Sequence, residues 1–291
     1  MRKRILITGH TGFIGTSVAK AIERNDDYRV FGMSRSNGYD LLRQDAFKVS
    51  DVDIIVHAAG AIGVSESWEY PVDFFQTNFI TTLNVLEFAR KTSIPVVYIS
   101  SYMYGAPKYL PINESHPVAC NNPYAQSKRQ AELLCEAYAR DFGLSITVLR
   151  PFNIYGPHMS TQNVIGRVIK QAVTSDTINV RDLHPCRDYL YIDDMSNGLI
   201  KTIEKSLLRD RNYSGMDIYN IGYGKSYSVQ EIIDIVFQVT GNRLKVVTSG
   251  DRRRNEIMDC YADNTKFSKE FSWQPEVTIF SGIKKQLILT I

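Results

Sequence analysis

Short apolar runs alternate along the first half of the chain with longer segments in which apolar residues recur every three or four positions. The short runs are rich in β-branched residues, as buried strands are, and lie at 5–8, 30–33, 54–57, 96–100 and 146–149. The longer segments have the period of amphipathic helices and lie at 13–24, 72–90 and 123–142. Strands that alternate with helices are typical of a parallel sheet covered on both faces. The pattern therefore predicts a doubly wound α/β fold.

From Pro151 onward this alternation loosens. Loops rich in Asn, Gly, Pro and Tyr separate helical patterns at 164–173, 193–208 and 229–239. We expect residues 1–157 to form one domain and residues 158–291 to form mainly a smaller lobe, from which some segments return to the first domain.

Composition excludes several classes of protein. The 291 residues are 44% hydrophobic and 22% charged, with a formal net charge of +3, which does not suggest nucleic acid and modestly favours an anionic small ligand. No apolar run approaches the roughly 18 residues that span a membrane, and Met1-Arg2-Lys3-Arg4 leads into a strand without the apolar core of a signal peptide. We expect a cytoplasmic protein that binds neither nucleic acid nor a membrane.

The cysteines and histidines do not form a recognisable ligand set. The four cysteines show no C-x-x-C spacing, and no histidine has a second ligand at the spacing of a metal site. The cysteines are Cys120, Cys135, Cys186 and Cys260, and the histidines include His10, His57, His116 and His158. We expect neither a disulfide framework nor a bound metal.

The first predicted strand ends in a glycine-rich turn with G-x-x-G-x-x-G spacing. Glycines allow a tight turn and the close approach of a pyrophosphate, which then lies on the free amides of the following helix. The turn here follows a strand and precedes a helix, the context that the motif requires. We expect a Rossmann-type dinucleotide site that includes Gly9, Thr11, Gly12, Phe13, Ile14 and Gly15.

The end of the second predicted strand indicates which dinucleotide binds. An NAD enzyme usually carries a carboxylate there, about 20 positions after the turn, to bind the ribose hydroxyls. This chain has Ser34-Arg35 instead, and these side chains suit a 2′-phosphate. We therefore expect NADP(H), with NAD(H) as the alternative.

Tyr124 and Lys128 lie one helical turn apart near the start of a predicted helix, where Asn122 suits the N-cap and Pro123 the first helical position. At positions i and i+4 both side chains project from one face. A phenol has a pKa of about 10, so bringing it near 7 requires roughly 4 kcal/mol of phenolate stabilisation. A neighbouring ammonium, the helix dipole and a bound nicotinamide cation are suitable sources. The pair predicts a proton-transferring tyrosine.

Several motifs in order make the chain similar to the extended short-chain dehydrogenase/reductase family, the nucleotide-sugar epimerases, dehydratases and reductases. Besides the glycine turn and the Tyr124–Lys128 pair, they are His57-Ala58-Ala59-Gly60, Asn78, Ser100 to Gly105, Arg150 to Pro157, Arg187-Asp188-Tyr189 and Arg253 to Glu256. The resemblance covers nearly the whole length. It implies a Rossmann domain that carries the cofactor and the catalytic residues, and a lobe that binds the substrate.

The resemblance also implies residue roles. Ser100, four positions before Tyr104, matches the catalytic serine or threonine, and Ser101 can share its role. Tyr124 matches the general acid/base, and Lys128 matches the residue that binds the nicotinamide ribose. The further residues assigned to the cofactor are Asp40, Leu41, Ala58, Ala59, Asn78 and Pro151.

Asn153, Arg187 and Arg253 match residues that bind the diphosphate of a nucleoside-diphosphate sugar. Guanidinium and amide donors suit this group, because they make charge-assisted bonds of defined geometry. An internal salt bridge with Asp188 is the alternative for Arg187, and a solvated basic loop is the alternative for residues 252–254.

Local differences separate the reactions of the family. The 4,6-dehydratases carry Asp-Glu directly after the catalytic hydroxyl, where this chain has Ser101-Tyr102, so dehydration is disfavoured. Residues 66–78 and 253–263 look most like UDP-sugar 4-epimerases. In contrast, Ser34-Arg35 and the short segment after them resemble NADPH-dependent reductases of 4-keto-6-deoxy sugars. We expect reduction at C4 of such a nucleotide sugar, with 4-epimerisation as the alternative.

A regulator that binds NADP(H) without chemistry is a remote alternative, because such relatives typically lose the active-site tyrosine or lysine. The family resemblance further implies a product used as a precursor of lipopolysaccharide or polysaccharide. It also implies a homodimer, in which the helices at 72–90 and 123–142 pack with those of a second copy as a four-helix bundle.

Overall fold

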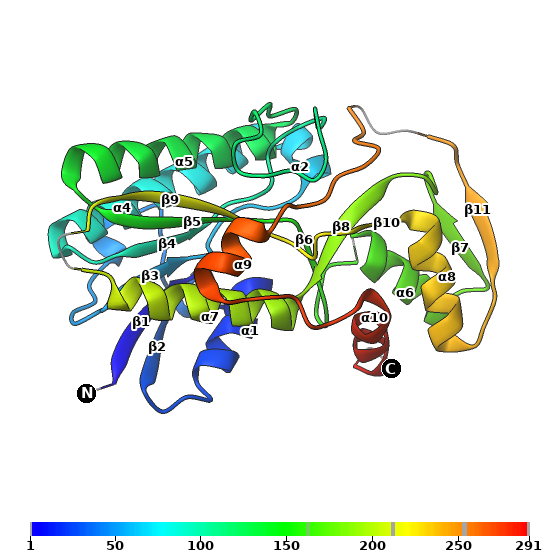
Figure 1. The fold of residues 1–291 in the computed structure, drawn as a ribbon, viewed down its shortest axis with the longest axis horizontal. Helices are drawn as coiled ribbons and strands as arrows, with labels where there is room; N and C mark the ends of the chain where they lie inside the picture. The colour runs from blue at the N-terminus through cyan, green and yellow to red at the C-terminus, as the bar shows by residue number, and fades with distance from the viewer. Residues whose placement is uncertain (1, 162, 211–212, 252–254, 290–291) are drawn as a thin grey trace.

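A six-stranded parallel sheet forms the centre of the computed structural model, which describes residues 2–161, 163–210, 213–251 and 255–289. The strand order is β2-β1-β3-β4-β5-β9 (Figure 1). The strands are β1 (Lys3–Thr8), β2 (Tyr28–Met33), β3 (Ile54–His57), β4 (Val96–Ile99), β5 (Ser145–Pro151) and β9 (Gly215–Ile221). The doubly wound α/β fold predicted from the sequence is confirmed.

Helices cover both faces of this sheet (Figure 1). On one face lie α1 (Phe13–Ile22), α7 (Ile192–Leu208) and α9 (Thr265–Phe271), and on the other lie α4 (Thr81–Thr92) and α5 (Pro123–Phe142). Side chains alternate along each strand, so that Ile5 and Ile7 join the first core and Leu6 joins the second. Each face of the sheet is therefore buried.

The predicted helix at 72–90 is present as one continuous helical segment that contains a π-helical turn. The structure has α3 (Pro71–Phe75), a short π-helix η3 (Gln76–Ile80) and then α4, and α2 (Val64–Glu69) precedes them. The π-helix carries Asn78, which is buried. Two short 3-10 helices, η1 (Arg35–Asn37) and η2 (Gln44–Ala46), occupy the segment between β2 and β3.

A smaller lobe lies beyond the end of β5 (Figure 1). It contains the sheet of β6 (Asn153–Tyr155), β8 (Cys186–Tyr191) and β10 (Ser226–Ser228), and the parallel pair β7 (Thr177–Val180) and β11 (Lys245–Thr248). Its helices are α6 (Val164–Thr174), α8 (Val229–Thr240) and α10 (Ile279–Ile288), which share one apolar core with β8. Within the described residues, none of the helices combines the length and apolar character that crossing a bilayer requires.

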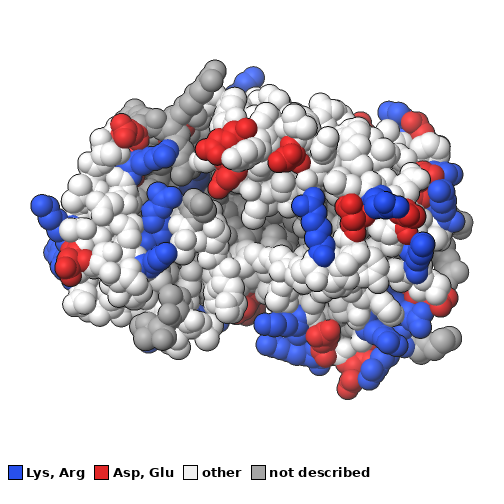
Figure 2. Space-filling model, turned by 180° about the vertical axis from the view of Figure 1, so that it is seen from behind, with Lys and Arg blue, Asp and Glu red and all other residues white. Residues whose placement is uncertain are grey.

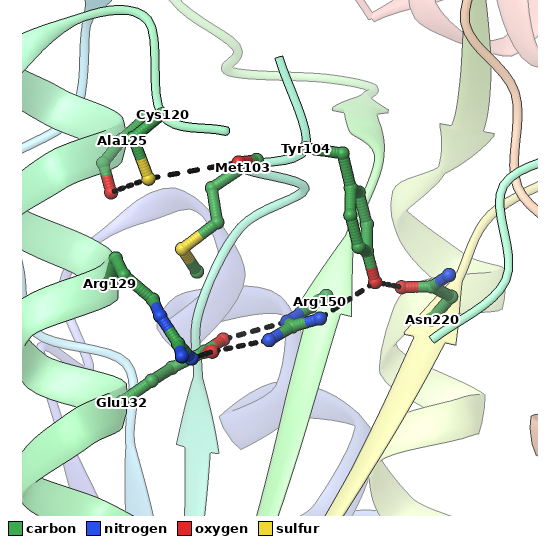
Figure 3. A network of polar contacts seen from close by, with 8 residues as sticks. All are labelled: Met103, Tyr104, Cys120, Ala125, Arg129, Glu132, Arg150 and Asn220. Atoms are coloured by element: carbon green, nitrogen blue, oxygen red, sulfur yellow. Dashed lines mark hydrogen bonds and ion pairs between the residues drawn. The ribbon is translucent and has the colours of Figure 1, made fainter. Parts of the chain in front are cut away.

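A buried ion pair links α5 to the sheet (Figure 3). The carboxylate of Glu132 accepts hydrogen bonds from Arg150 Nε and Nη2 at 2.9 and 2.6 Å, and neither side chain is more than 2% exposed. Arg150 Nη1 donates to the hydroxyl of Tyr104, which donates to Asn220 Oδ1 at 2.6 Å. Four segments far apart in the sequence thereby share one network: α5, β5, the loop after β4, and β9.

Replacing Glu132 with glutamine leaves the buried Arg150 guanidinium without its counter-charge. We expect Glu132→Gln to lower the free energy of unfolding by about 3–5 kcal/mol. The reason is that Arg150 stays buried and charged, without water or a carboxylate to stabilise it. Urea denaturation at pH 7 measures this change. The matched control is Asp141→Asn on the same helix, which removes an exposed pair with Arg140 and leaves the urea midpoint unchanged. A midpoint for Glu132→Gln equal to that of the wild type contradicts the role of the pair.

Candidate active site

The glycine turn between β1 and α1 leaves the start of that helix open. Gly9 has a φ of +71°, and a Cβ atom there would lie 2.7 Å from the backbone of Ala59 at the end of β3. Gly12 is the N-cap of α1 and provides no side-chain cap, and the first turn holds no acidic residue. The free amides of Phe13, Ile14 and their neighbours therefore suit a pyrophosphate, which the expected dinucleotide carries.

A cluster of hydroxyl groups lies beside this turn, at the end of β2. The Ser34 hydroxyl contacts Ser36 Oγ at 2.9 Å and Asn37 Oδ1 at 3.0 Å, and Ser36 Oγ donates to Thr11 Oγ1 at 3.0 Å. Arg35 is exposed, and its guanidinium has no acidic partner within the described parts of the chain. The end of β2 thus presents hydroxyls and one cation without a carboxylate.

The segment that follows β2 brings two more predicted cofactor residues near the sheet. Asp40 is exposed and accepts a hydrogen bond from the amide of Leu42. Leu41 is buried in the core under α4, and its carbonyl accepts a hydrogen bond from Asn84 Nδ2 at 2.9 Å. Leu41 is therefore fixed against α4, whereas Asp40 lies at the surface.

Tyr124 lies in the first turn of α5. Asn122 caps this helix by accepting a hydrogen bond from the amide of Ala125 at 2.8 Å, and Pro123 occupies the first helical position, as the sequence predicted. The phenol packs edge-on against Phe74, with 6.1 Å between ring centroids. Burial raises the pKa of Tyr124, and a hydrogen bond with Ser101 acts in the opposite direction. An unliganded Tyr124 is therefore a protonated phenol at pH 7, able to donate.

Lys128 lies one turn further along α5 and is only 4% exposed. Its ammonium donates to the carbonyl of Ile99 at the end of β4, at 2.9 Å. Burial lowers the pKa of Lys128 to about 8, and the charge of Glu132 one turn later partly opposes this effect. Because that value lies above 7, the ammonium form predominates at neutral pH.

Asn78 of the π-helix connects the loop after β3 to α5. Its Oδ1 accepts from the amide of Ala61 at 2.8 Å, and its Nδ2 donates to Ser127 Oγ at 2.8 Å. A Cβ atom on Gly60 would lie 2.7 Å from Asn78 Oδ1 and 3.2 Å from Lys128 Nζ. Sequence reasoning assigned no role to Gly60, although its place in the predicted His57-to-Gly60 motif was the available signal.

His57, the last residue of β3, is a buried structural residue. Its Nδ1 lies 2.7 Å from Thr8 Oγ1, and its Nε2 lies 3.0 Å from Thr82 Oγ1. Burial, followed by the charge of Lys128, lowers the pKa of His57 to about 3. The imidazole is therefore neutral and does not serve as an acid/base at neutral pH.

Both predicted serines follow directly after β4. Ser100 is 3% exposed, and its hydroxyl has no hydrogen-bond partner in the portion of the chain that the structure describes. Ser101 is 8% exposed, and its interaction with Tyr124 lowers the pKa of the phenol. Both hydroxyls therefore stay predicted ligands of the sugar oxygen, Ser100 as the catalytic serine and Ser101 as a residue that can share its role.

The predicted diphosphate ligands have internal partners. Asn153 accepts a hydrogen bond from the Tyr102 hydroxyl at 3.1 Å and donates to the carbonyl of Asp188 at 3.0 Å. Arg187 forms an ion pair with Glu256 at 2.5 Å, so its partner is not the neighbouring Asp188. Arg253 lies outside the described residues.

The carboxylate of Asp188 instead accepts hydrogen bonds from the amides of Tyr223, Gly224 and Ala262, at 2.7, 2.9 and 3.1 Å. Burial nevertheless raises its pKa to about 6. Through these hydrogen bonds, Asp188 links β8 to the segment after β9. Sequence reasoning did not assign Tyr102 or Glu256 to the site, and the signal for Glu256 was its place in the last of the motifs.

The surface charges are unevenly distributed. On the face seen in Figure 2, lysine and arginine side chains lie mainly toward the two ends of the molecule, and acidic side chains also gather in the upper middle of the view. Tyr102 and Phe152, which stack at 4.8 Å between ring centroids, lie in the segments that follow β4 and β5.

Comparison with known proteins places this arrangement in a family. Residues 5–222 match the profile of the NAD dependent epimerase/dehydratase family. The chain is 31% identical over 304 residues to a putative UDP-glucose 4-epimerase of Methanocaldococcus jannaschii, an alignment that covers 97% of this chain and 96% of the relative.

Two solved structures share the whole fold. RMD from Pseudomonas aeruginosa, complexed with NADPH, superposes with a TM-score of 0.87 and is 27% identical, with 98% of each chain covered. The UDP-glucose 4-epimerase from Bifidobacterium longum, in complex with NAD+ and UDP, superposes with a TM-score of 0.86 and is 28% identical, with 99% of this chain and 98% of that chain covered. The chain belongs to the NAD dependent epimerase/dehydratase family.

Proposed function

We propose that the protein reduces a 4-keto-6-deoxy nucleoside-diphosphate sugar at C4 with NADPH. The observation that carries this proposal is the end of β2, where Ser34, Ser36 and Thr11 present hydroxyls beside the exposed Arg35 and no carboxylate is present. A carboxylate at this position would repel a 2′-phosphate, whereas a guanidinium and hydroxyls bind one. NADPH in the complex of RMD, a protein of the same fold, is consistent with this choice.

The glycine turn and the free amides of α1 are the groups that would bind the pyrophosphate, with Ala58 and Ala59 alongside. Lys128 and Asn78 lie at the carboxyl edge of the sheet, where the nicotinamide ribose is expected. When bound, the cofactor supplies the hydride for C4. Side chains of the protein perform the other steps.

Tyr124 is the proton donor in this proposal. A carbonyl that gains a hydride becomes an alkoxide, and a phenol within hydrogen-bond reach can give it a proton. Ser100 is the predicted ligand of the same sugar oxygen, and Ser101, whose interaction with Tyr124 lowers the pKa of the phenol, can share this role. The ammonium of Lys128 stabilises the tyrosinate that remains, because the site is desolvated and the interaction is weakly screened.

Substrate binding requires a change of partners in the smaller lobe. We propose that the diphosphate takes the place of the Glu256 carboxylate on Arg187, with Asn153 and Arg253 as further ligands. Residues 1–157 then carry cofactor and catalysis, and residues 158–291 contribute mainly to substrate binding. The expected homodimer stays a prediction. It is supported by Leu133 and Phe142 on α5, which are 40% and 53% exposed.

A second candidate is 4-epimerisation of a UDP-hexose with retained NAD. It is favoured by the 31% identity to the putative UDP-glucose 4-epimerase and by the 28% identity to the structure with NAD+ and UDP. The same Tyr124 and Lys128 serve both reactions. The difference lies in whether the cofactor is consumed.

The function is tested by supplying NADPH and a 4-keto-6-deoxy nucleotide sugar and following NADPH absorbance. We expect stoichiometric oxidation of NADPH and a protein that purifies without tightly held NAD. Copurified NAD, no net oxidation, and interconversion of UDP-glucose and UDP-galactose would establish the second candidate instead.

Tyr124→Phe removes the transferable proton and keeps the ring. We expect kcat to fall by about 10² to 10⁴, the usual contribution of a positioned acid or base, while the Kd for NADPH is unchanged. Steady-state kinetics and fluorescence titration measure the two quantities. Tyr138→Phe, which removes another phenol from α5 that is bonded to Glu87, is the matched control and keeps full turnover. Normal turnover in Tyr124→Phe excludes the phenol from the mechanism.

Arg35→Ala removes the cation at the end of β2. A hydrogen bond to a charged group contributes about 1.5–3 kcal/mol, so we expect the Kd for NADPH to rise by about 10- to 100-fold and the Kd for NADH to stay the same. Calorimetric titration with both cofactors measures this selectivity. Arg24→Ala, an exposed arginine just beyond the other end of α1, is the control. An equal loss for both cofactors contradicts a 2′-phosphate site.

A further inference from the structure

The ammonium of Lys128 lies over an aromatic ring that no motif singled out. Its Nζ is 5.1 Å from the ring centroid of Tyr98, within the range of a cation–π interaction. Tyr98 belongs to β4, and the next residue of that strand, Ile99, supplies the carbonyl that accepts from Nζ at 2.9 Å. Two consecutive residues of one strand thus contact the same cation.

Burial makes this contact stronger than a surface one. Tyr98 is 1% exposed and Lys128 is 4% exposed. Water cannot solvate an ammonium at such a position, and a desolvated cation gains more from the negative face of an aromatic ring than an exposed cation does.

The ring itself is held in place from the neighbouring strand. Tyr98 lies opposite His57 in the register of β3 and β4, and the two rings stack at 5.5 Å with 26° between their planes. His57 is fixed in turn by contacts with Thr8 and Thr82. The face that Tyr98 presents to Lys128 therefore has one orientation.

No carboxylate pairs directly with Lys128 among the residues that the structure describes. Glu132 lies one turn along α5, but both of its oxygens accept hydrogen bonds from Arg150. Two other titratable groups are coupled electrostatically to Lys128. They are Cys135 on α5 and His57 on β3, and both are neutral at pH 7. The ring and one carbonyl thus replace a counter-ion.

We propose that Tyr98 is a positioning residue that keeps Lys128 charged and fixed below Tyr124 by offering it the face of its ring. This inference rests on the catalytic role of Lys128 in the proposed function. A carboxylate at the place of the ring would cancel the positive potential that Tyr124 needs as it loses its proton. An aromatic face stabilises the cation without adding a net negative charge, so the potential is preserved.

The test compares Tyr98→Phe, which keeps the ring face, with Tyr98→Leu, which removes it. The readout is the pKa of Lys128, measured by NMR titration of protein labelled with 13C at the lysine ε carbon, with the signal assigned by its loss in Lys128→Arg. Loss of the ring disfavours the charged form, so the pKa falls further below its present value of about 8. We expect a fall of about one unit in Tyr98→Leu and no change in Tyr98→Phe.

Two controls make the outcome specific. Phe267→Leu removes a buried ring from the core on the opposite face of the sheet and leaves the Lys128 titration unchanged. Tyr98→Met, which fills more of the space of the ring without aromatic character, replaces Tyr98→Leu if that variant does not fold. It is expected to show the same fall.

An unchanged titration in the leucine or methionine variant, or an equal fall in Tyr98→Phe, overturns the proposal. Because the titration needs no sugar, its result is separate from the fate of the proposed function. A fall of the expected size in a protein that oxidises no NADPH with any keto sugar would leave the positioning role intact and reject the reductase.

Discussion

The burial of one positive charge is the constraint around which the site is arranged. Lys128 is almost fully enclosed, and its ammonium is tolerated because Ile99 supplies a carbonyl and Tyr98 an aromatic face. Gly60 has no side chain, and a Cβ atom at this position would crowd both Asn78 and Lys128. In the proposed reaction, this weakly screened cation lowers the energy of the tyrosinate that proton donation by Tyr124 leaves behind.

The rest of the fold keeps α5 in register with the sheet edge that carries this charge. The paired Glu132 and Arg150 connect the helix to β5, and the hydroxyl of Tyr104 extends the connection to Asn220 on β9. These groups are buried and mutually satisfied, so a shift of α5 would leave charges unpaired. The same helix carries Tyr124 and Lys128. The contacts that stabilise the fold therefore also hold these two residues in place.

Much of the fold could be predicted from the sequence, because these features depend on residues that lie close together in the chain. The period of apolar residues identified the strands from β1 to β5, and Asn122-Pro123 marked the start of α5. The strand β9 was not predicted, since it lies at an edge and its partner, β5, is some 70 residues earlier in the chain. The pairing of Arg187 with Glu256 was not predicted either, since it joins residues that lie 69 positions apart in the sequence.

In the proposed reaction, hydride passes from NADPH to C4 of a keto sugar, and isotope transfer follows this step directly. The protein is given NADPH carrying deuterium at the transferred position of the nicotinamide, together with a 4-keto-6-deoxy nucleotide sugar, and the product is analysed by mass spectrometry and NMR. We predict one deuterium at C4 for each NADPH oxidised. Recovery of the keto sugar unchanged and unlabelled, with NADPH not oxidised, would contradict the proposed reaction.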